Sequence, residues 1–118
     1  MAIIINTQSR DFTEVEQYLM TLDRGIKSLK DVEDNTSIAV GGYLTFTDEK
    51  ENGDSVDILS IITPDNEVFS CQSATFKRSF NNITNIMHGK QFSIIKVGGT
   101  TKNGRPYIDC ALDVKSVK

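Results

Sequence analysis

The chain has 118 residues, of which 38% are hydrophobic and 25% charged, a composition typical of one small globular domain. No apolar run is long enough to cross a bilayer, and the apolar opening over residues 1–6 lacks the basic flank and cleavage pattern of a signal peptide. We therefore expect a cytoplasmic protein. The net charge of −3 conceals an asymmetry: residues 1–75 carry 5 Lys/Arg against 14 Asp/Glu, a net charge of −9, whereas residues 76–118 carry 8 against 2, a net charge of +6. The basic part could form one local surface patch, or pair with the acidic part across strands.

The first 36 residues predict a strand or arm over 1–6 and a helix over 11–22. Thr13 can cap this helix, and two glutamates fall in its first turn, where the helix dipole favours acids. Three apolar residues share one face of it: Val15, Leu19 and Leu22. Gly25 is placed to end the helix, and the apolar spacing over 26–34 indicates one more short helical turn.

From residue 37 the pattern becomes that of strands, with β-branched and aromatic residues over 37–47. The pair Gly41-Gly42 inside this first strand predicts a bulge or a sharp bend, the device by which one strand joins both faces of a small barrel. An Asn52-Gly53 turn leads to a second strand over 56–63, and a third strand follows over 68–72. We expect these three strands to form a meander.

A helix is predicted after the third strand. Ser73 can cap it and Gly89 is placed to end it. Between them, four apolar residues recur at helical spacing: Phe76, Phe80, Ile83 and Met87. Two more strands are predicted over 92–97 and 106–112, joined by a loop with Asn103-Gly104 at its tip.

Three strands, a helix and two strands is the order of an OB barrel, in which the helix plugs one end of the barrel. We therefore predict a mainly β fold in a single domain over 1–118. It would consist of an N-terminal strand and helix extension over 1–36, a five-stranded OB barrel over 37–112, and a short tail over 113–118.

Candidate catalytic groups are few. His88 stands alone before a glycine at the end of the predicted helix, where a cation suits the helix dipole. Cys71 and Cys110 lie in apolar strands without CxxC spacing, so we interpret them as buried reduced thiols, ahead of a disulfide or a metal site. No serine or cysteine has a histidine partner at hand. We therefore expect no enzyme activity, no metal and no cofactor.

The remaining chemistry is that of a binding surface, because aromatic and basic side chains are interleaved in the predicted barrel. Unpaired bases stack on aromatic rings, at about 1–3 kcal/mol per base, and cations follow the phosphates. The rings expected to stack are Tyr43, Phe69 and Tyr107, and the cations expected to meet phosphates are Lys77, Arg78, Lys96, Lys102 and Arg105. Alternation along the last strand puts Ile108, Cys110 and Leu112 on one face and points Tyr107 away from them. Alternation along the fourth strand places Lys96 at the barrel rim.

Several segments resemble the small single-stranded DNA-binding proteins of phages and mobile elements. The resembling segments are Gly42-Tyr43-Leu44-Thr45-Phe46, Ile61 to Phe69, Ser73-Ala74-Thr75-Phe76 and, above all, Thr100 to Cys110. The resemblance implies an OB fold that coats single-stranded DNA in replication or recombination without reading its sequence, in the host-cell cytoplasm if a phage encodes it. Bacterial proteins of this type end in an acidic tip that recruits partners. This sequence ends at Lys118 without such a tip, which does not favour recruitment by that route.

The leading prediction is thus a non-catalytic single-stranded DNA-binding protein, with homo-oligomers possible and with no membrane or small-molecule partner. The alternative is a protein-interaction module or inhibitor that presents the acidic residues 1–75 to a basic partner. The N-terminal helical region lies outside the simple barrel, where it could serve dimerisation or cover one barrel end. Recognition of duplex DNA is not favoured, because the sequence shows no exposed recognition helix, and the preference between DNA and RNA stays open.

Overall fold

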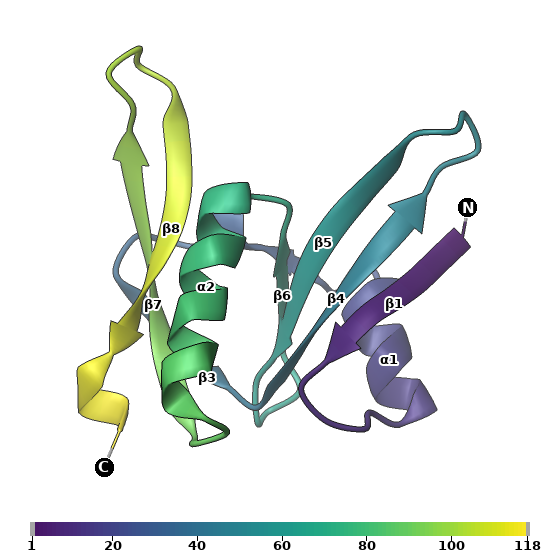
Figure 1. The fold of residues 1–118 in the computed structure, drawn as a ribbon, viewed down its shortest axis with the longest axis horizontal. Helices are drawn as coiled ribbons and strands as arrows, with labels where there is room; N and C mark the ends of the chain where they lie inside the picture. The colour runs from purple at the N-terminus through teal and green to yellow at the C-terminus, as the bar shows by residue number, and fades with distance from the viewer. Residues whose placement is uncertain (1, 118) are drawn as a thin grey trace.

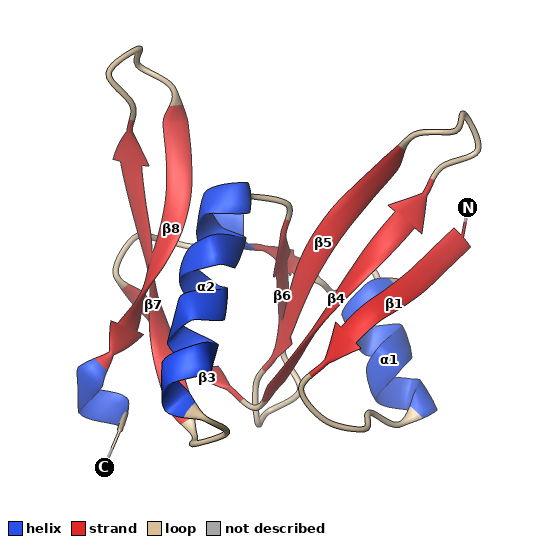
Figure 2. Ribbon diagram, in the orientation of Figure 1, coloured by secondary structure: helices blue, strands red, loops and turns tan. Residues whose placement is uncertain are grey.

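The computed structural model describes residues 2–117, in which strands outnumber helices (Figure 2). The strands are β1 (Ala2–Gln8), β2 (Lys27–Ser28), β3 (Thr36–Val40), β4 (Gly42–Glu49), β5 (Ser55–Ile62), β6 (Val68–Cys71), β7 (Phe92–Thr100) and β8 (Pro106–Asp113). The α-helices are α1 (Glu14–Thr21) and α2 (Ala74–Met87), and two short 3-10 helices are η1 (Leu29–Asp31) and η2 (Val114–Ser116). The prediction of a mainly β fold is confirmed.

The strands form two sheets (Figure 1). The larger sheet has the order β1-β4-β5-β6-β2 and the smaller has the order β3-β7-β8. Neighbouring strands are antiparallel except for β2 with β6. The β4–β5 and β7–β8 hairpins turn at Gly53 and Gly104, with φ of 90° and 80°, so both predicted Asn-Gly turns are confirmed.

The first predicted strand is divided at Gly41 into β3 and β4, which lie in different sheets. A Cβ at Gly41 would stand 3.0 Å from backbone atoms of Thr63 and Pro64, and a Cβ at Gly42 would stand 2.8 Å from the ring of Phe12. Both glycines therefore permit a close approach of chain segments at this point. The predicted bend is confirmed, and it lets one length of chain pair with β5 on one side and with β7 on the other.

The predicted closed barrel is wrong. β6 pairs with β5 and with β2, β8 pairs with β7 alone, and within residues 2–117 no hydrogen-bonded pairing joins β6 to β8. α2 leads from β6 to β7 and lies between the two sheets in Figure 1. Its buried Phe76 and Phe80 belong to the apolar core between the two sheets.

Two apolar clusters hold these layers together. One lies between the two sheets and α2, and it contains Ile61, Phe76 and Ile94, which are all fully buried. The other lies between the larger sheet and α1, around Met20 and Leu44. The predicted apolar stripe of α2 is confirmed, since its residues belong to or pack against the first cluster: Phe76, Phe80, Ile83 and Met87.

The N-terminal region forms more structure than predicted. Its first residues form β1, paired with β4, although Met1 lies outside the described residues. The helical turn expected over 26–34 is η1, and the short β2 before it was not predicted. In the predicted tail, η2 follows β8, and Lys118 lies outside the described residues.

α1 lies within the predicted range of 11–22, and its predicted cap is confirmed. Thr13 caps it through a capping box, in which the side chains of Thr13 and Glu16 each accept from the other's backbone N–H, at 3.1 Å and 2.9 Å. The helix ends at Thr21 rather than at Gly25. The Asp23 carboxylate accepts from the Gly25 N–H at 3.1 Å, which stabilises a turn between the end of the helix and Gly25.

The predicted apolar face of α1 is not the face that packs. Met20 is fully buried and Leu19 packs beside it, whereas Val15 is 69% exposed and Leu22 is 52% exposed. The helix turns Met20 toward the larger sheet, and this leaves the Val15 side unpartnered in the described structure.

Candidate nucleic-acid interface

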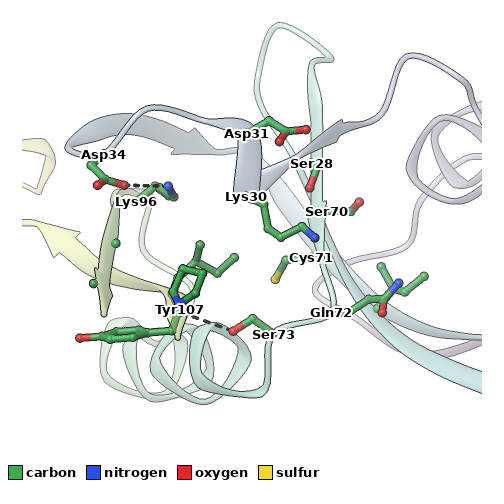
Figure 3. Close-up of a pocket in the computed structure, with 15 residues that line it drawn as sticks. Ser28, Lys30, Asp31, Asp34, Ser70, Cys71, Gln72, Ser73, Lys96 and Tyr107 are labelled. Carbon is green, nitrogen blue, oxygen red and sulfur yellow. Dashed lines mark hydrogen bonds and ion pairs between the residues drawn. The ribbon is translucent and has the colours of Figure 1, made fainter. Parts of the chain in front are cut away.

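A cleft of about 940 Å³ opens between the two sheets (Figure 3). One wall consists of residues from the 28–34 segment and from the end of β6. The other wall comes from β7 at 96–99 and β8 at 106–108. The cleft therefore occupies the region where β6 and β8 do not pair, and much of its lining is polar.

Ser73 joins the two walls at the start of α2. Its Oγ accepts a hydrogen bond from the Phe76 N–H at 3.1 Å, which caps the helix as predicted. The same hydroxyl donates to the Ile108 carbonyl oxygen in β8 at 3.4 Å, as the dashed line in Figure 3 shows. The first turn of α2 carries no acidic residue, so this N-terminus adds a positive dipole end beside the cleft.

Lys96 is a buried cation in the wall of the cleft. Its side chain is 6% exposed, and its ammonium lies 2.7 Å from Asp34 Oδ1 (Figure 3). The Asp34 side chain is 57% exposed. The alternation predicted for β7 is confirmed, since Lys96 shares the buried face of Phe92 and Ile94, but its projection at an open rim is wrong. A buried ammonium requires a counter-ion, and Asp34 supplies it.

Tyr107 lies on the β7–β8 hairpin. It pairs with Gly99 across the two strands, and its ring covers this glycine so closely that a Cβ there would lie 2.7 Å from Tyr107 Cε1. The residue is 42% exposed, and its side chain points away from Cys71 and Ser73 in Figure 3. One side of the ring thus rests on backbone, which leaves the other side open. The predicted outward direction of Tyr107 is confirmed, because Cys110 on the opposite face is buried.

Lys102 and Arg105 lie at the tip of the same hairpin, where both are exposed. Neither forms an ion pair within residues 2–117. The turn is fixed by Thr101, whose Oγ accepts from the Arg105 N–H at 3.1 Å, and by the positive φ of Gly104. Two unneutralised cations and one exposed ring therefore share a short hairpin of defined geometry.

The other two rings predicted to stack face the interior. Tyr43 is half-buried and packs edge-on against Phe80, with ring centroids 5.0 Å apart. Phe69 is 8% exposed, and Lys27 Nζ lies 5.4 Å from its ring centroid. Both residues belong with the core between the sheets. The bend at Gly41-Gly42 shifts the alternation along the strand that contains Tyr43, so the sequence does not decide which way this ring faces.

Lys77 and Arg78 form a separate group near the start of α2. Lys77 Nζ donates to the Asp57 carbonyl oxygen in β5 at 3.1 Å, which connects α2 to the larger sheet. Arg78 is exposed and makes no ion pair within the described residues. The predicted cations are therefore divided between the hairpin, the start of α2 and the buried position of Lys96.

Lys30 is a cleft residue that the sequence did not single out for binding. Its side chain extends into the cleft toward Ser70 and Cys71 in Figure 3, and no acidic side chain pairs with it among residues 2–117. The local sequence indicates only a lysine in a helical turn. The cleft that Lys30 enters is formed by segments far apart in the sequence, as the contact between Asp34 and Lys96, 62 residues apart, illustrates.

Both cysteines are free and buried, as predicted. Burial raises the pKa of the Cys71 thiol from 9.0 to about 11, and this residue lines the cleft. Burial, with Asp109 and Cys71 nearby, raises the pKa of the Cys110 thiol to about 12. Both thiols are therefore neutral at physiological pH, and neither is activated as a nucleophile.

No family model, no curated protein and no solved structure matches the chain. No helix in the described part of the chain has the length and apolarity needed to span a membrane. Within residues 2–117, no three side chains of His, Cys, Asp or Glu are grouped closely enough to hold one metal ion. Any assignment of function depends on the cleft and the hairpin.

Proposed function

We propose that this chain is a single-stranded DNA-binding protein that does not read sequence, and that the strand runs along the β7–β8 hairpin and the adjacent cleft. The observation that carries the proposal is the open ring of Tyr107, held on Gly99, with the unpaired Lys102 and Arg105 on the same hairpin. Single-stranded nucleic acid is bound by this combination of a stacking platform and nearby cations. In a duplex the bases are already stacked, so the ring would have no partner.

The lining of the cleft supports a path for the strand beyond the hairpin. Lys30 offers a cation to a phosphate on the far wall, and Ser28, Ser70 and Gln72 offer hydrogen bonds. Hydroxyl and amide groups of this kind bond sugars, phosphates and bases alike. They therefore favour retention of a strand without strong discrimination between bases.

The charge of the other hairpin favours one direction of approach. The β4–β5 hairpin carries four acidic residues around its tip: Asp48, Glu49, Glu51 and Asp54. These carboxylates repel a phosphate chain, whereas the β7–β8 hairpin attracts it. We therefore place the strand on the β7–β8 side of the cleft.

We also propose that the fold is an OB barrel opened at one seam. The bent β3–β4 segment pairs with both β5 and β7, β5 pairs with β6, and β7 pairs with β8. α2 lies between β6 and β7 in the sequence, which is the helix position in that fold. The pairing that would close the barrel is β6 with β8, and the cleft takes its place.

Fluorescence anisotropy of a labelled oligo-dT, titrated at low and at moderate salt beside duplex DNA, tests the proposal. We expect salt-weakened binding to the single strand and much weaker binding to the duplex. A double variant, Tyr107→Ala with Lys102→Ala, should lose at least tenfold in affinity, because it removes one stacked base at about 1–3 kcal/mol and one phosphate contact.

A matched control removes the same side chains elsewhere. Tyr18→Ala with Lys50→Ala also deletes an exposed tyrosine and a lysine, from α1 and the β4–β5 connection. This variant should bind oligo-dT like the wild type. Equal losses in both double variants would contradict the proposed location, and no binding by the wild type at low salt would contradict the function.

A second candidate function is favoured by the exposed side of α1. Val15, Tyr18 and Leu22 are 69%, 52% and 52% exposed at helical spacing, in the part of the chain with a net charge of −9. This surface suits a basic segment of a partner protein, with apolar contacts at the centre and carboxylates at the rim. Absence of DNA binding, together with binding of a Lys-rich amphipathic peptide that Tyr18→Ala abolishes, would support it.

A further inference from the structure

We infer that Asp34 competes with phosphate for Lys96, so that a phosphate enters this part of the cleft by replacing the Asp34 carboxylate on the Lys96 ammonium. The inference rests on the proposed function for the source of the phosphate, which is the backbone of a single strand. It identifies the residue that limits affinity at the proposed site.

Lys96 has capacity for a further partner. An ammonium carries three N–H donors, and the recorded partner of Lys96 is Asp34 Oδ1, at 2.7 Å. The residue is 5% exposed, and it forms part of the cleft wall. An ammonium buried to this extent without an anion beside it is strongly destabilising, so Asp34 leaves at little cost only when another anion arrives.

Asp34 is placed where such an exchange is possible. Its side chain is 57% exposed, and it lies between η1 and β3, directly before Asn35 with its positive φ of 70°. Released from Lys96, the carboxylate would be hydrated in solvent, and the charge that stays buried is the Lys96 ammonium. A phosphodiester carries the same single negative charge, so the exchange preserves the neutralisation of Lys96.

Gly98 shows how closely the carboxylate is accommodated. A Cβ at this position would lie 2.6 Å from Asp34 Oδ1, 2.9 Å from Oδ2 and 3.0 Å from Cγ. The ion pair as observed therefore depends on the absence of a side chain at residue 98. Gly98 does not have the positive φ that would exclude alanine, so a methyl group there acts on Asp34 rather than on the backbone.

The surroundings favour phosphate as the competing anion. Lys30 extends into the same cleft without an acidic partner within residues 2–117, and the Gly99–Tyr107 platform adjoins Gly98 on β7. Lys96 and Gly98 face the cleft, whereas Gly99 and the Tyr107 ring lie on the other face of the β7–β8 hairpin. A phosphate on Lys96 and a base on Tyr107 would therefore belong to different nucleotides of one strand.

The first test uses inorganic pyrophosphate and the 1H–15N spectrum of the wild-type protein. We expect the amide signals of Gly98 and Asn35 to shift on titration, because both residues adjoin the Asp34–Lys96 pair. Unchanged signals at these two residues, at concentrations that shift Lys102, would overturn the inference without any variant.

The second test compares two charge-matched variants. Asp34→Asn and Asp31→Asn each remove one negative charge from the same cleft, but only Asp34 contacts Lys96. We expect Asp34→Asn to bind pyrophosphate and oligo-dT about fivefold tighter than Asp31→Asn, with a salt slope for oligo-dT steeper by about 0.7. Equal affinity for pyrophosphate in the two variants would overturn the inference.

A third variant separates competition from net charge. Gly98→Ala keeps Asp34 and Lys96 but displaces the carboxylate, so it should also tighten pyrophosphate binding. It takes the place of Asp34→Asn in the test if that variant does not fold. A loss of affinity in folded Gly98→Ala would contradict the inference. The wild type could fail to bind oligo-dT while Asp34→Asn binds pyrophosphate more tightly than Asp31→Asn. The competition would then stand and the proposed function would fail. If instead the wild type binds oligo-dT and the two variants bind pyrophosphate equally, the function stands and the competition is overturned.

Discussion

The ring of Tyr107 covers the backbone of Gly99 on the opposite strand of the β7–β8 hairpin. Replacement of Gly99 by alanine places a methyl group inside the volume of the ring, and the ring has to move. We expect Gly99→Ala to weaken oligo-dT binding about fivefold, since part of one base stack worth about 1–3 kcal/mol is lost. Anisotropy with the same labelled oligonucleotide measures this change.

Replacement of the neighbouring Gly98 should change the affinity for oligo-dT in the opposite direction. Gly98→Ala displaces Asp34 and should tighten binding, whereas Gly99→Ala displaces Tyr107 and should weaken it. Both variants add one methyl group to β7. A change of the same sign in both would indicate a general distortion of the hairpin, and would contradict the separate roles of Asp34 and Tyr107.

Lys102 and Arg105 should determine much of the salt dependence of binding. Each phosphate contact contributes about 0.7 to the slope of log affinity against log salt for a single strand. The double variant Lys102→Ala with Arg105→Ala should therefore reduce the slope by about 1.4. Lys77→Ala removes a lysine from α2 instead and serves as the comparison. An unchanged slope in the double variant would show that the hairpin does not contact phosphates.

The buried thiols should reduce stability at high pH. Their pKa values are raised from 9.0 to about 11 for Cys71 and about 12 for Cys110, so the stability they contribute is fully present below pH 9. It is lost as the pH rises from about 9 through the folded-state values, because the unfolded chain ionises first. Urea unfolding at pH 8 and pH 10 measures the loss. The loss of unfolding free energy should be smaller in the double variant Cys71→Ala with Cys110→Ala. Equal losses in this variant and the wild type would contradict the assignment of the loss to the two thiols.

Phe76 should be among the residues most important for stability. It is fully buried in the cluster between the two sheets and α2. Phe76→Ala should lower the free energy of unfolding by about 3–5 kcal/mol, whereas the exposed Ile86→Ala on the same helix should change it by less than about 1 kcal/mol. Similar urea midpoints for the two variants would contradict the layered core described above.

Local sequence patterns predicted the elements whose structure depends on near neighbours. The 3.6-residue spacing from Phe76 to Met87, with Ser73 as cap, specified α2, and the two Asn-Gly pairs specified the hairpin turns. The glycine pair at 41–42 predicted the bend between β3 and β4. In each case a local steric or hydrogen-bonding requirement determines the conformation.

Features that depend on distant segments could not be predicted in this way. The sequence does not show that β6 and β8 stay unpaired, so the seam was expected to be closed. Burial of Lys96 depends on Asp34 from another part of the chain, and burial of Phe69 depends on which sheet face meets α2. Of the predicted interface, the hairpin with Tyr107 was accessible to sequence reasoning, whereas the opposite wall of the cleft was not.

The most direct measurement is a 1H–15N titration of the protein with short unlabelled oligo-dT. We expect the largest shifts on residues 98–107 of the β7–β8 hairpin and on residues 28–34 across the cleft, while the signals of α1 and the β4–β5 hairpin remain unchanged. Shifts confined to α1, or an unchanged spectrum at low salt, would contradict the account of the cleft and hairpin as a single-stranded DNA interface.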